Sequence, residues 1–301
     1  MSIKLDFIGI GVEKGGSTWL AQMMSKHPSI CFPKDSTGIY FYNKRDSHNP
    51  NRVTDNYELI GYKWYEDQFS LCSPNAIKGE MTPVYIYCQD AIERIAADQP
   101  DIKIICILRN PVKRAFSQYL HEKKLGLIKE DTSFEEVIQS NIDLLDKGLY
   151  YKHLQNIYAH FPTSNIHISL LDDVKEDPVG VLDRVFQHIG AETGKVKSDQ
   201  AAERVNTAKK PLFPWLNAWI YSMKTRLREI DNFFSKSLLL LLRKIGISTF
   251  LVSLPERLTK KDENPQENFS ESQKKYLLEY YKEDIIQLEK LIQRDLHAWL
   301  E

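Results

Sequence analysis

The chain has 301 residues, of which 42% are hydrophobic and 27% charged, an ordinary composition for a soluble globular protein. Forty Lys and Arg against 41 Asp and Glu leave a net charge of −1, which argues against a general nucleic-acid-binding protein. This balance also gives the chain no electrostatic reason to bind an anionic membrane. No repeat or convincing boundary interrupts the sequence, so we expect a single domain over residues 1–301.

The cysteines and the apolar segments bear on compartment and metal binding. No CxxC pair or Cys/His cluster has zinc spacing, so we expect no metal site and reduced, packing cysteines at Cys31, Cys72, Cys88 and Cys106. The N-terminal residues show no signal-peptide pattern. Arg243 and Lys244 interrupt the most apolar run, Ser237–Leu254, which favours a buried helix, with an interfacial helix as the alternative. We therefore predict a cytoplasmic protein without a membrane span, with peripheral membrane contact left open.

Strands and helices alternate over the first two thirds of the chain. Short apolar runs predict buried strands at Leu5–Gly11, Ile102–Leu108 and Ile166–Leu171. Helical spacing and Pro or Gly stop signals predict helices at Thr18–His27, Val112–Leu125, Ser133–Lys147, Tyr150–Phe161, Pro178–Ile189 and Ser270–Arg294. This alternation indicates a parallel sheet covered by helices on both faces. Anionic ligands bind beyond the carboxyl ends of the strands in such folds.

The last third of the chain follows a different pattern. Residues 195–215 are polar and rich in proline and lysine, which predicts a loop, and Thr259–Gln266 is a charged segment expected to be mobile. We interpret residues from about 195 to 270 as an irregular and helical insertion that covers the site.

The first strand leads into Gly11-Val12-Glu13-Lys14-Gly15-Gly16-Ser17-Thr18 at the start of the first helix. A helix N-terminus presents unpaired N–H groups and partial positive charge, and glycines allow an anion to approach the backbone closely. The spacing approaches that of a Walker A loop, but Ser17 stands where that motif has lysine, and Lys14 comes two residues before Gly16. The segment therefore predicts a phosphate-binding loop whose chemistry differs from that of a metal-dependent NTPase.

A second signal follows the next apolar strand. Arg109 comes directly after that strand, and Ser117 lies about two helical turns further on. An arginine at this edge of the sheet can bind a phosphate through two parallel hydrogen bonds, and a serine on the adjoining helix can add a hydroxyl.

Together these two motifs resemble the cofactor signature of sulfotransferases that use 3′-phosphoadenosine-5′-phosphosulfate (PAPS). Further segments agree in order with that family, namely His27-Pro28, Ile39–Tyr42, Gly61–Tyr65, Gly79–Pro83 and Asp295–Trp299. The resemblance covers most of residues 5–190 and is strongest to bacterial members and to the domains that act on heparan sulfate. It implies a P-loop-like three-layer α/β fold with a helical C-terminal part, and transfer of a sulfuryl group without a metal.

The resemblance also assigns residues to the cofactor. It implies that the 5′-phosphosulfate is held by Lys14, Gly15, Gly16, Ser17, Thr18 and Trp19. Arg109 and Ser117 would hold the 3′-phosphate, and the segment Arg204–Pro211 is the candidate cap over the nucleotide, with contacts from Asn206 and Lys209. Lys14 is suited to stabilise the charge that develops on the departing phosphate oxygen. The expected product is 3′-phosphoadenosine-5′-phosphate (PAP).

The acceptor must lose a proton, so a general base is expected within hydrogen-bond reach. Asp35 is the first candidate, although its spacing to the following aromatics is longer than in relatives that act on heparan sulfate. Glu80 is the second, as a base or as a structural residue, and His48 and His121 remain further alternatives. Met81 stands where the family has a lysine, which puts a second catalytic cation in doubt.

The acceptor is predicted only as a class, a hydroxyl or amine on a small molecule or a saccharide. Tyrosines, phenylalanine and tryptophan gather in the segments that would face it and would either stack on it or form ordinary core, namely Tyr40, Phe41, Tyr42, Tyr62, Trp64, Tyr65, Tyr85 and Tyr87. A nucleotide kinase or NTPase, and a nucleotide-binding protein without catalysis, are the alternative functions. We expect no nucleic-acid partner. The sequence does not distinguish a monomer from a homodimer.

Overall fold

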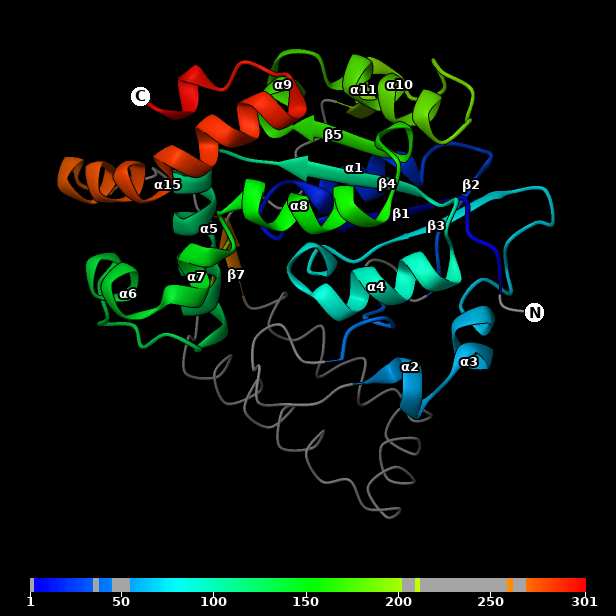
Figure 1. Cartoon of the computed structure of the whole chain (residues 1–301), viewed down its shortest axis with the longest axis horizontal. Coiled ribbons are helices and arrows are strands. Elements are labelled where there is room, and N and C mark those ends of the chain that lie inside the picture. The colour runs from blue at the N-terminus through cyan, green and yellow to red at the C-terminus, as the bar shows by residue number, and fades with distance from the viewer. Residues whose placement is uncertain (1–2, 35–37, 45–54, 202–208, 212–258, 262–268) are drawn as a thin grey trace. The chain divides into compact units, whose positions relative to one another are not determined.

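The computed structural model describes residues 3–34, 38–44, 55–201, 209–211, 259–261 and 269–301 (Figure 1). The chain divides into two compact units. The first consists of residues 1–114, 146–205 and 274–301, and the second of residues 115–145 and 206–273. No helix within the described ranges is long and apolar enough to cross a membrane.

A five-stranded parallel sheet in the order β2-β3-β1-β4-β5 forms the centre of the first unit. Its strands are β1 (Phe7–Gly11), β2 (Ile30–Cys31), β3 (Ile77–Met81), β4 (Lys103–Leu108) and β5 (Ile166–Leu170). The three predicted strands are therefore β1, β4 and β5. Because β1 and β4 are parallel neighbours, the loops that follow them lie at the same edge of the sheet.

Helices cover both faces of this sheet, as predicted. Figure 1 shows α4 (Gln89–Asp98) and α8 (Tyr150–His160) in front of the strands and α1 (Ser17–Met24) behind them. The core on the α1 side joins Phe7, Ile105 and Ile107 of the sheet to α1 and to α10 (Pro178–His188). The α/β fold with a central parallel sheet is thus confirmed.

The remaining helices of the first unit are short, apart from the C-terminal one. They are α2 (Asn56–Leu59), α3 (Tyr62–Asp67), α9 (Leu171–Glu176), α11 (Ser198–Ala201) and α15 (Glu271–Ile292), whose first residues belong to the second unit. The carboxylate of Asp284 on α15 accepts backbone N–H groups of Tyr151 (3.0 Å) and Lys152 (3.1 Å). This contact satisfies first-turn donors of α8 and anchors α15, which confirms the predicted helical C-terminal part.

In the second unit, α5 (Pro111–Leu125) starts at the end of the first unit and is followed by α6 (Phe134–Ser140) and α7 (Ile142–Asp146). The prediction of a single helix over Ser133–Lys147 is therefore wrong. The helix breaks at Asn141, whose side-chain oxygen accepts the N–H of Leu144 at 3.1 Å and so starts a new helix.

Two further predictions about the last third need correction. Residues predicted to lie in a loop and in a charged mobile segment form β6 (Lys209–Pro211) and β7 (Thr259–Lys261), which pair antiparallel. Backbone pairing overrides the polar composition of both segments. The helix predicted over residues 237–254 and most of the proposed insertion at 195–270 lie outside the described residues.

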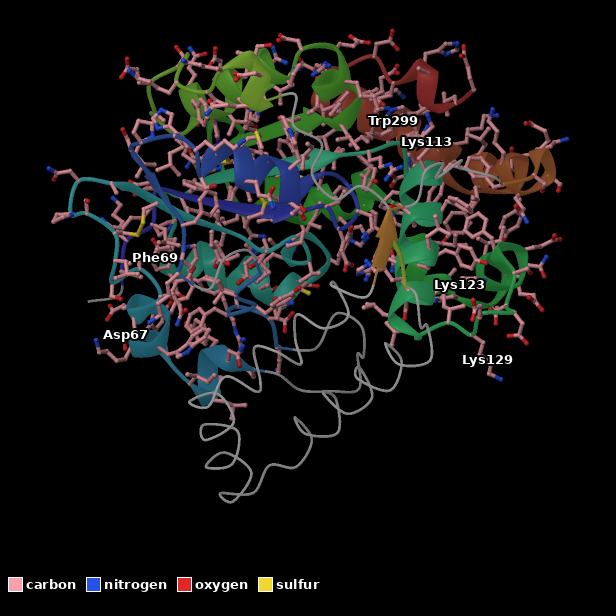
Figure 2. All side chains as sticks on the ribbon, turned by 180° about the vertical axis from the view of Figure 1, so that it is seen from behind. Asp67, Phe69, Lys113, Lys123, Lys129 and Trp299 are labelled. Atoms are coloured by element: carbon pink, nitrogen blue, oxygen red, sulfur yellow. A yellow bond between two sulfur atoms is a disulfide. The ribbon has the colours of Figure 1, made fainter. Side chains whose placement is uncertain are left out.

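The cysteines also depart from the expectation. Cys31, at the end of β2, forms a disulfide with Cys72, and the two Cα atoms lie 5.7 Å apart (Figure 2). Cys88 and Cys106 are free thiols, as predicted, and burial raises their pKa values. The sequence offered no sign of the pairing, because 41 positions separate the two residues and only the fold brings them together.

Candidate nucleotide site

The loop after β1 is held in a tight, defined path. The N–H of Val12 donates to the carbonyl oxygen of Ile107 on β4 (3.0 Å), and the N–H of Gly15 donates to that of Val12 (3.0 Å). Lys14 and Gly16 adopt left-handed backbone conformations, with φ angles of 64° and 106°. The loop therefore turns back on itself just before α1, at the edge where β4 also ends.

Gly15 lies where the structure leaves no room for a side chain. A Cβ atom at this position would lie 2.4 Å from the Val12 side chain and 2.6 Å from the Ile107 carbonyl oxygen. Real Cβ atoms do not approach so closely, so only glycine keeps this path of the loop. The glycine thus lets the loop pack directly against the end of β4.

The N-terminus of α1 fits an anion. Gly16 occupies the N-cap position and has no side chain to accept the N–H groups of the first turn. Ser17 and Thr18 follow with hydroxyl groups. The indole N–H of Trp19 donates to the carbonyl oxygen of Ala201 (3.2 Å), so Trp19 offers a ligand only its backbone N–H. These donors, together with Lys14, suit a 5′-phosphosulfate.

Arg109 lies beside this loop. A guanidinium nitrogen of Arg109 donates to the carbonyl oxygen of Lys14 at 3.4 Å, and the hydroxyl of Tyr150 donates to the carbonyl oxygen of Arg109 at 2.8 Å. Arg109 directly follows β4, and its side chain is partly exposed. The structure thus brings Lys14 and Arg109 together, although 95 positions separate them in the sequence.

Ser117 lies in α5, about two turns after Arg109. The side chain of Asn110 caps this helix by accepting the N–H groups of Val112 (3.0 Å) and Lys113 (3.2 Å). The helix therefore begins immediately after Arg109, as the sequence predicted. Ser117 itself is partly exposed and belongs to the second unit.

Glu80 sits at the end of β3 and is fully buried. Its carboxylate accepts hydroxyl hydrogen bonds from Tyr65 (2.6 Å), Thr82 (2.6 Å) and Tyr85 (3.3 Å). Burial raises the pKa of Glu80, and the three hydroxyl donors offset part of that rise. With both oxygens occupied and no exposed surface, the carboxylate is arranged to hold its neighbours in place.

The aromatic segments form a core. Phe41 stacks on Tyr65 with ring centroids 4.2 Å apart, and both rings are fully buried, as are Tyr42 and Tyr85. These four side chains are packed inside the first unit. Of the residues proposed to face the acceptor, Tyr40 is exposed.

Other predicted residues fall elsewhere. Asp35, His48 and Asn206 lie outside the described residues, and so does the side chain of Lys209, whose backbone pairs with Lys261. His121 lies on α5. Met81 is buried in the core against α1, where its sulfur fills the space that Gly9 leaves open. Among the described residues no group of three or more His, Cys, Asp or Glu side chains could hold a metal ion.

Sequence reasoning missed an ion pair at this site. The ammonium of Lys147 lies 2.9 Å from a carboxylate oxygen of Glu13, inside the nucleotide loop. No local pattern could have indicated the pair, because 134 positions separate its members. Only the packing of the segment before α8 against the edge of the sheet brings them together.

A family model described as a sulfotransferase domain matches residues 4–238. The chain belongs to the sulfotransferase domain family. This assignment confirms the family that the two nucleotide motifs indicated.

Curated relatives match part of their own length. Heparan sulfate glucosamine 3-O-sulfotransferase 3B1 of Mus musculus is 29% identical over 60% of this chain and 45% of its own. The bifunctional heparan sulfate N-deacetylase/N-sulfotransferase 3 of Homo sapiens is 30% identical over 61% of this chain and 22% of its own. The chain thus spans less than half the length of these two relatives.

Solved structures share the fold. A sulfotransferase from Alicyclobacillus acidocaldarius superimposes with a TM-score of 0.68 at 20% identity, covering 99% of this chain and 100% of its own. The sulfotransferase domain from the curacin biosynthetic pathway gives a TM-score of 0.50 at 13% identity, covering 68% of this chain and 80% of its own. At these identities the likeness establishes the P-loop-like three-layer architecture.

Proposed function

We propose that the chain is an enzyme that transfers a sulfuryl group from PAPS to a hydroxyl or amine of an acceptor. The observation that carries the proposal is the contact between the Lys14 loop and Arg109 at the shared edge of β1 and β4. One motif supplies donors for a 5′-phosphosulfate, and the other supplies a cation for a 3′-phosphate. A nucleotide with phosphate at both positions matches this pair, and membership of the sulfotransferase domain family supports the same ligand.

Each residue of the candidate site has a distinct role in the proposed reaction. PAPS supplies the activated sulfuryl group. Lys14, at the left-handed turn of the loop, stabilises the negative charge that grows on the departing phosphate oxygen. The backbone N–H groups at the start of α1, with Ser17 and Thr18, orient the 5′ end, while Arg109 and Ser117 bind the 3′-phosphate. The segment with Asn206 and Lys209 caps the nucleotide.

The base that takes the acceptor's proton remains a prediction. Asp35 is our first candidate, because the complete burial and three hydroxyl partners of Glu80 favour a positioning role for that residue. A comparison of Asp35→Asn with Glu80→Gln tests this choice. We expect Asp35→Asn to lower kcat with unchanged PAP affinity and unchanged melting temperature. A fully active Asp35→Asn enzyme would contradict the choice.

For the acceptor we propose a saccharide ahead of a small metabolite. The two curated relatives are named for sulfation of heparan sulfate, one at oxygen and one at nitrogen, and this favours an amino sugar without deciding between the two positions. A panel of short glycans with free hydroxyls, free amines or both, incubated with PAPS, would identify the acceptor class by mass spectrometry.

The compartment is a separate proposal. The prediction of a cytoplasmic protein rested partly on reduced cysteines, whereas the Cys31–Cys72 disulfide is typical of oxidising compartments. Alkylation of free thiols in freshly lysed cells, followed by peptide mass spectrometry, decides between these environments. Two alkylated cysteines would favour an oxidising environment, and four would favour the cytoplasm.

The first experiment on function is ligand-dependent thermal stability. PAP at about 100 times its dissociation constant adds roughly 2.7 kcal/mol to the stability of the folded state. For a chain of this size, that corresponds to a rise in melting temperature of about 5 °C. We expect this rise with PAP and a much smaller one with AMP, which lacks the 3′-phosphate.

Matched variants separate the site from general effects. Arg109→Ala should lose the response to PAP, whereas Arg184→Ala, which removes a half-exposed arginine on α10, should keep it. A response to Mg-ATP that survives in Arg109→Ala, with none to PAP, would instead indicate a phosphoryl-transfer enzyme. PAP binding without turnover across the acceptor panel would indicate a nucleotide-binding protein without catalysis.

A further inference from the structure

Trp299 is buried against α9 and the start of α8, with 4% of its surface exposed (Figure 2). Its indole N–H donates to a carboxylate oxygen of Asp172 on α9 at 3.0 Å. Its ring meets that of Tyr150 edge to face, with the ring centroids 6.2 Å apart. The tryptophan belongs to the segment Asp295–Trp299, which agrees with the family pattern but to which the proposed function assigns no role.

Tyr150 connects this tryptophan to the second nucleotide motif. It is the first residue of α8 and is fully buried, and its hydroxyl donates to the carbonyl oxygen of Arg109 at 2.8 Å. Only Arg109 and Asn110 link β4 to α5, so this hydrogen bond holds a short connection. Because the carbonyl and the side chain of Arg109 share one Cα atom, fixing the carbonyl also limits the direction in which the side chain leaves the backbone.

The segment that carries Trp299 is itself attached to α9. One guanidinium nitrogen of Arg294 donates to both carboxylate oxygens of Asp173, at 2.9 Å each. Asp173 directly follows Asp172, so two adjacent carboxylates of α9 bind the segment at two points. The backbone N–H of Trp299 donates to the carbonyl oxygen of Leu296 at 2.8 Å, which closes a tight turn. These contacts hold the indole against Tyr150.

Packing explains how Trp299 acts at a distance from the nucleotide. A buried ring that loses a large neighbour shifts into part of the space left behind. A hydrogen bond weakens steeply when its geometry departs from the normal range, so a shift of the Tyr150 ring loosens its hold on Arg109. An arginine that binds a phosphate through two parallel hydrogen bonds needs both to be aligned at once. Small displacements of Arg109 therefore cost affinity for a phosphate.

We propose that Trp299 is a positioning residue for the 3′-phosphate, and that it acts by holding the Tyr150 ring so that the tyrosine hydroxyl fixes the backbone of Arg109. This inference rests on the proposed function, in which Arg109 binds that phosphate. It gives the segment Asp295–Trp299 a role in nucleotide binding, although the segment lies outside both nucleotide motifs.

The test compares the dissociation constants of PAP and AMP, measured by calorimetry without turnover. AMP lacks the 3′-phosphate, so its affinity depends little on the position of Arg109. Tyr150→Phe keeps the ring and removes the hydroxyl, and it should raise the Kd for PAP about fivefold, the worth of one hydrogen bond. Trp299→Leu should raise it by a similar factor, because it acts through the same bond. The Kd for AMP should change by less than about twofold in both variants.

Three further variants separate positioning from general damage. Trp299→Phe keeps an aromatic ring against Tyr150 and should bind PAP within about twofold of the wild type. Tyr151→Phe removes the next tyrosine hydroxyl of α8, which accepts from Gln155 on the same helix at 3.2 Å, and should leave both constants unchanged. Tyr150→Phe combined with Trp299→Leu should cost about fivefold in total, rather than the roughly 25-fold expected from two independent effects.

The ratio of the two dissociation constants decides the outcome. A rise for PAP alone in Tyr150→Phe and Trp299→Leu supports the inference. Equal changes for PAP and AMP, or independent effects in the double variant, would show that the tryptophan stabilises the fold without positioning Arg109, and would overturn it. An unchanged Kd for PAP in Tyr150→Phe would also overturn it, whether or not Trp299→Leu folds. If the wild type binds PAP no more tightly than AMP, the proposed function fails instead.

Discussion

Two histidines in the first unit make its stability sensitive to mild acid. His167 lies on β5 and His188 at the end of α10, with ring centroids 5.4 Å apart. Burial, and then the neighbouring His188, lowers the pKa of His167 from 6.5 to about 4. Burial also lowers the pKa of His188. Both rings are therefore held neutral in the folded protein at neutral pH.

The sign and size of the effect follow from proton linkage. Below pH 6.5 the unfolded chain binds a proton at His167 that the folded chain does not bind until about pH 4. The stabilisation is fully present above pH 6.5 and is lost as the pH falls towards 4. For these two pKa values the loss at pH 5 is about 2 kcal/mol, and His188 adds to it in the same direction.

The assay compares melting temperatures at pH 8 and pH 5 for the wild type and His167→Gln. Other groups also titrate over this range, so the quantity to measure is the difference between the two decreases. We expect the decrease for His167→Gln to be smaller by about 4 °C. His160→Gln, at the exposed end of α8, should behave as the wild type. Equal decreases in wild type and His167→Gln would refute the argument from burial.

Three further predictions concern the site and its support. Gly15→Ala should raise the Kd for PAP more than tenfold, because the new Cβ atom would collide with the backbone of β4, and calorimetry would detect it. Glu80→Gln should destabilise the protein by about 1–3 kcal/mol in a denaturant titration, because an amide cannot accept from every hydroxyl around it, while PAP affinity stays within twofold. Reduction of the Cys31–Cys72 bond should cost up to about 4 kcal/mol, the chain-entropy figure for a loop of this length, and should leave Arg109-dependent PAP binding intact. An unchanged melting temperature in reductant would contradict the last of these.

The sequence predicted the parts of the fold that follow from local apolar patterns. β1 and β4 are almost entirely apolar, β5 alternates apolar residues with His167 and Ser169, and the helices after them carry clear start and stop signals. β3 escaped notice because its sequence, IKGEM, contains Lys78, Gly79 and Glu80. A glutamate reads as a surface residue unless its partners are known, and here those partners come from α3 and from the segment after β3.

The candidate site, like the fold, could be predicted only where the signal is local in the sequence. Lys14, Gly15 and Arg109 could be proposed from the sequence because the pattern that points to each is local, at the end of a strand and the start of a helix. The Cys31–Cys72 bond and the pair of Glu13 with Lys147 could not, because each depends on segments that meet only in the folded chain. A single sequence shows local structural propensity and motif spacing. It does not show which distant residues pair in the fold.

The topology explains why the two motifs proposed to bind the nucleotide lie close together. In a parallel sheet every strand ends at the same edge, so loops after neighbouring strands lie within reach of each other however far apart they are in sequence. β1 and β4 are such neighbours, with Gly11 aligned with Cys106. A hydrogen bond from Arg109 to the carbonyl oxygen of Lys14 (3.4 Å) links the two loops directly. In the proposed function, an anion that bridges both loops would therefore meet cations that already lie close together, which lowers the cost of reorganisation on binding.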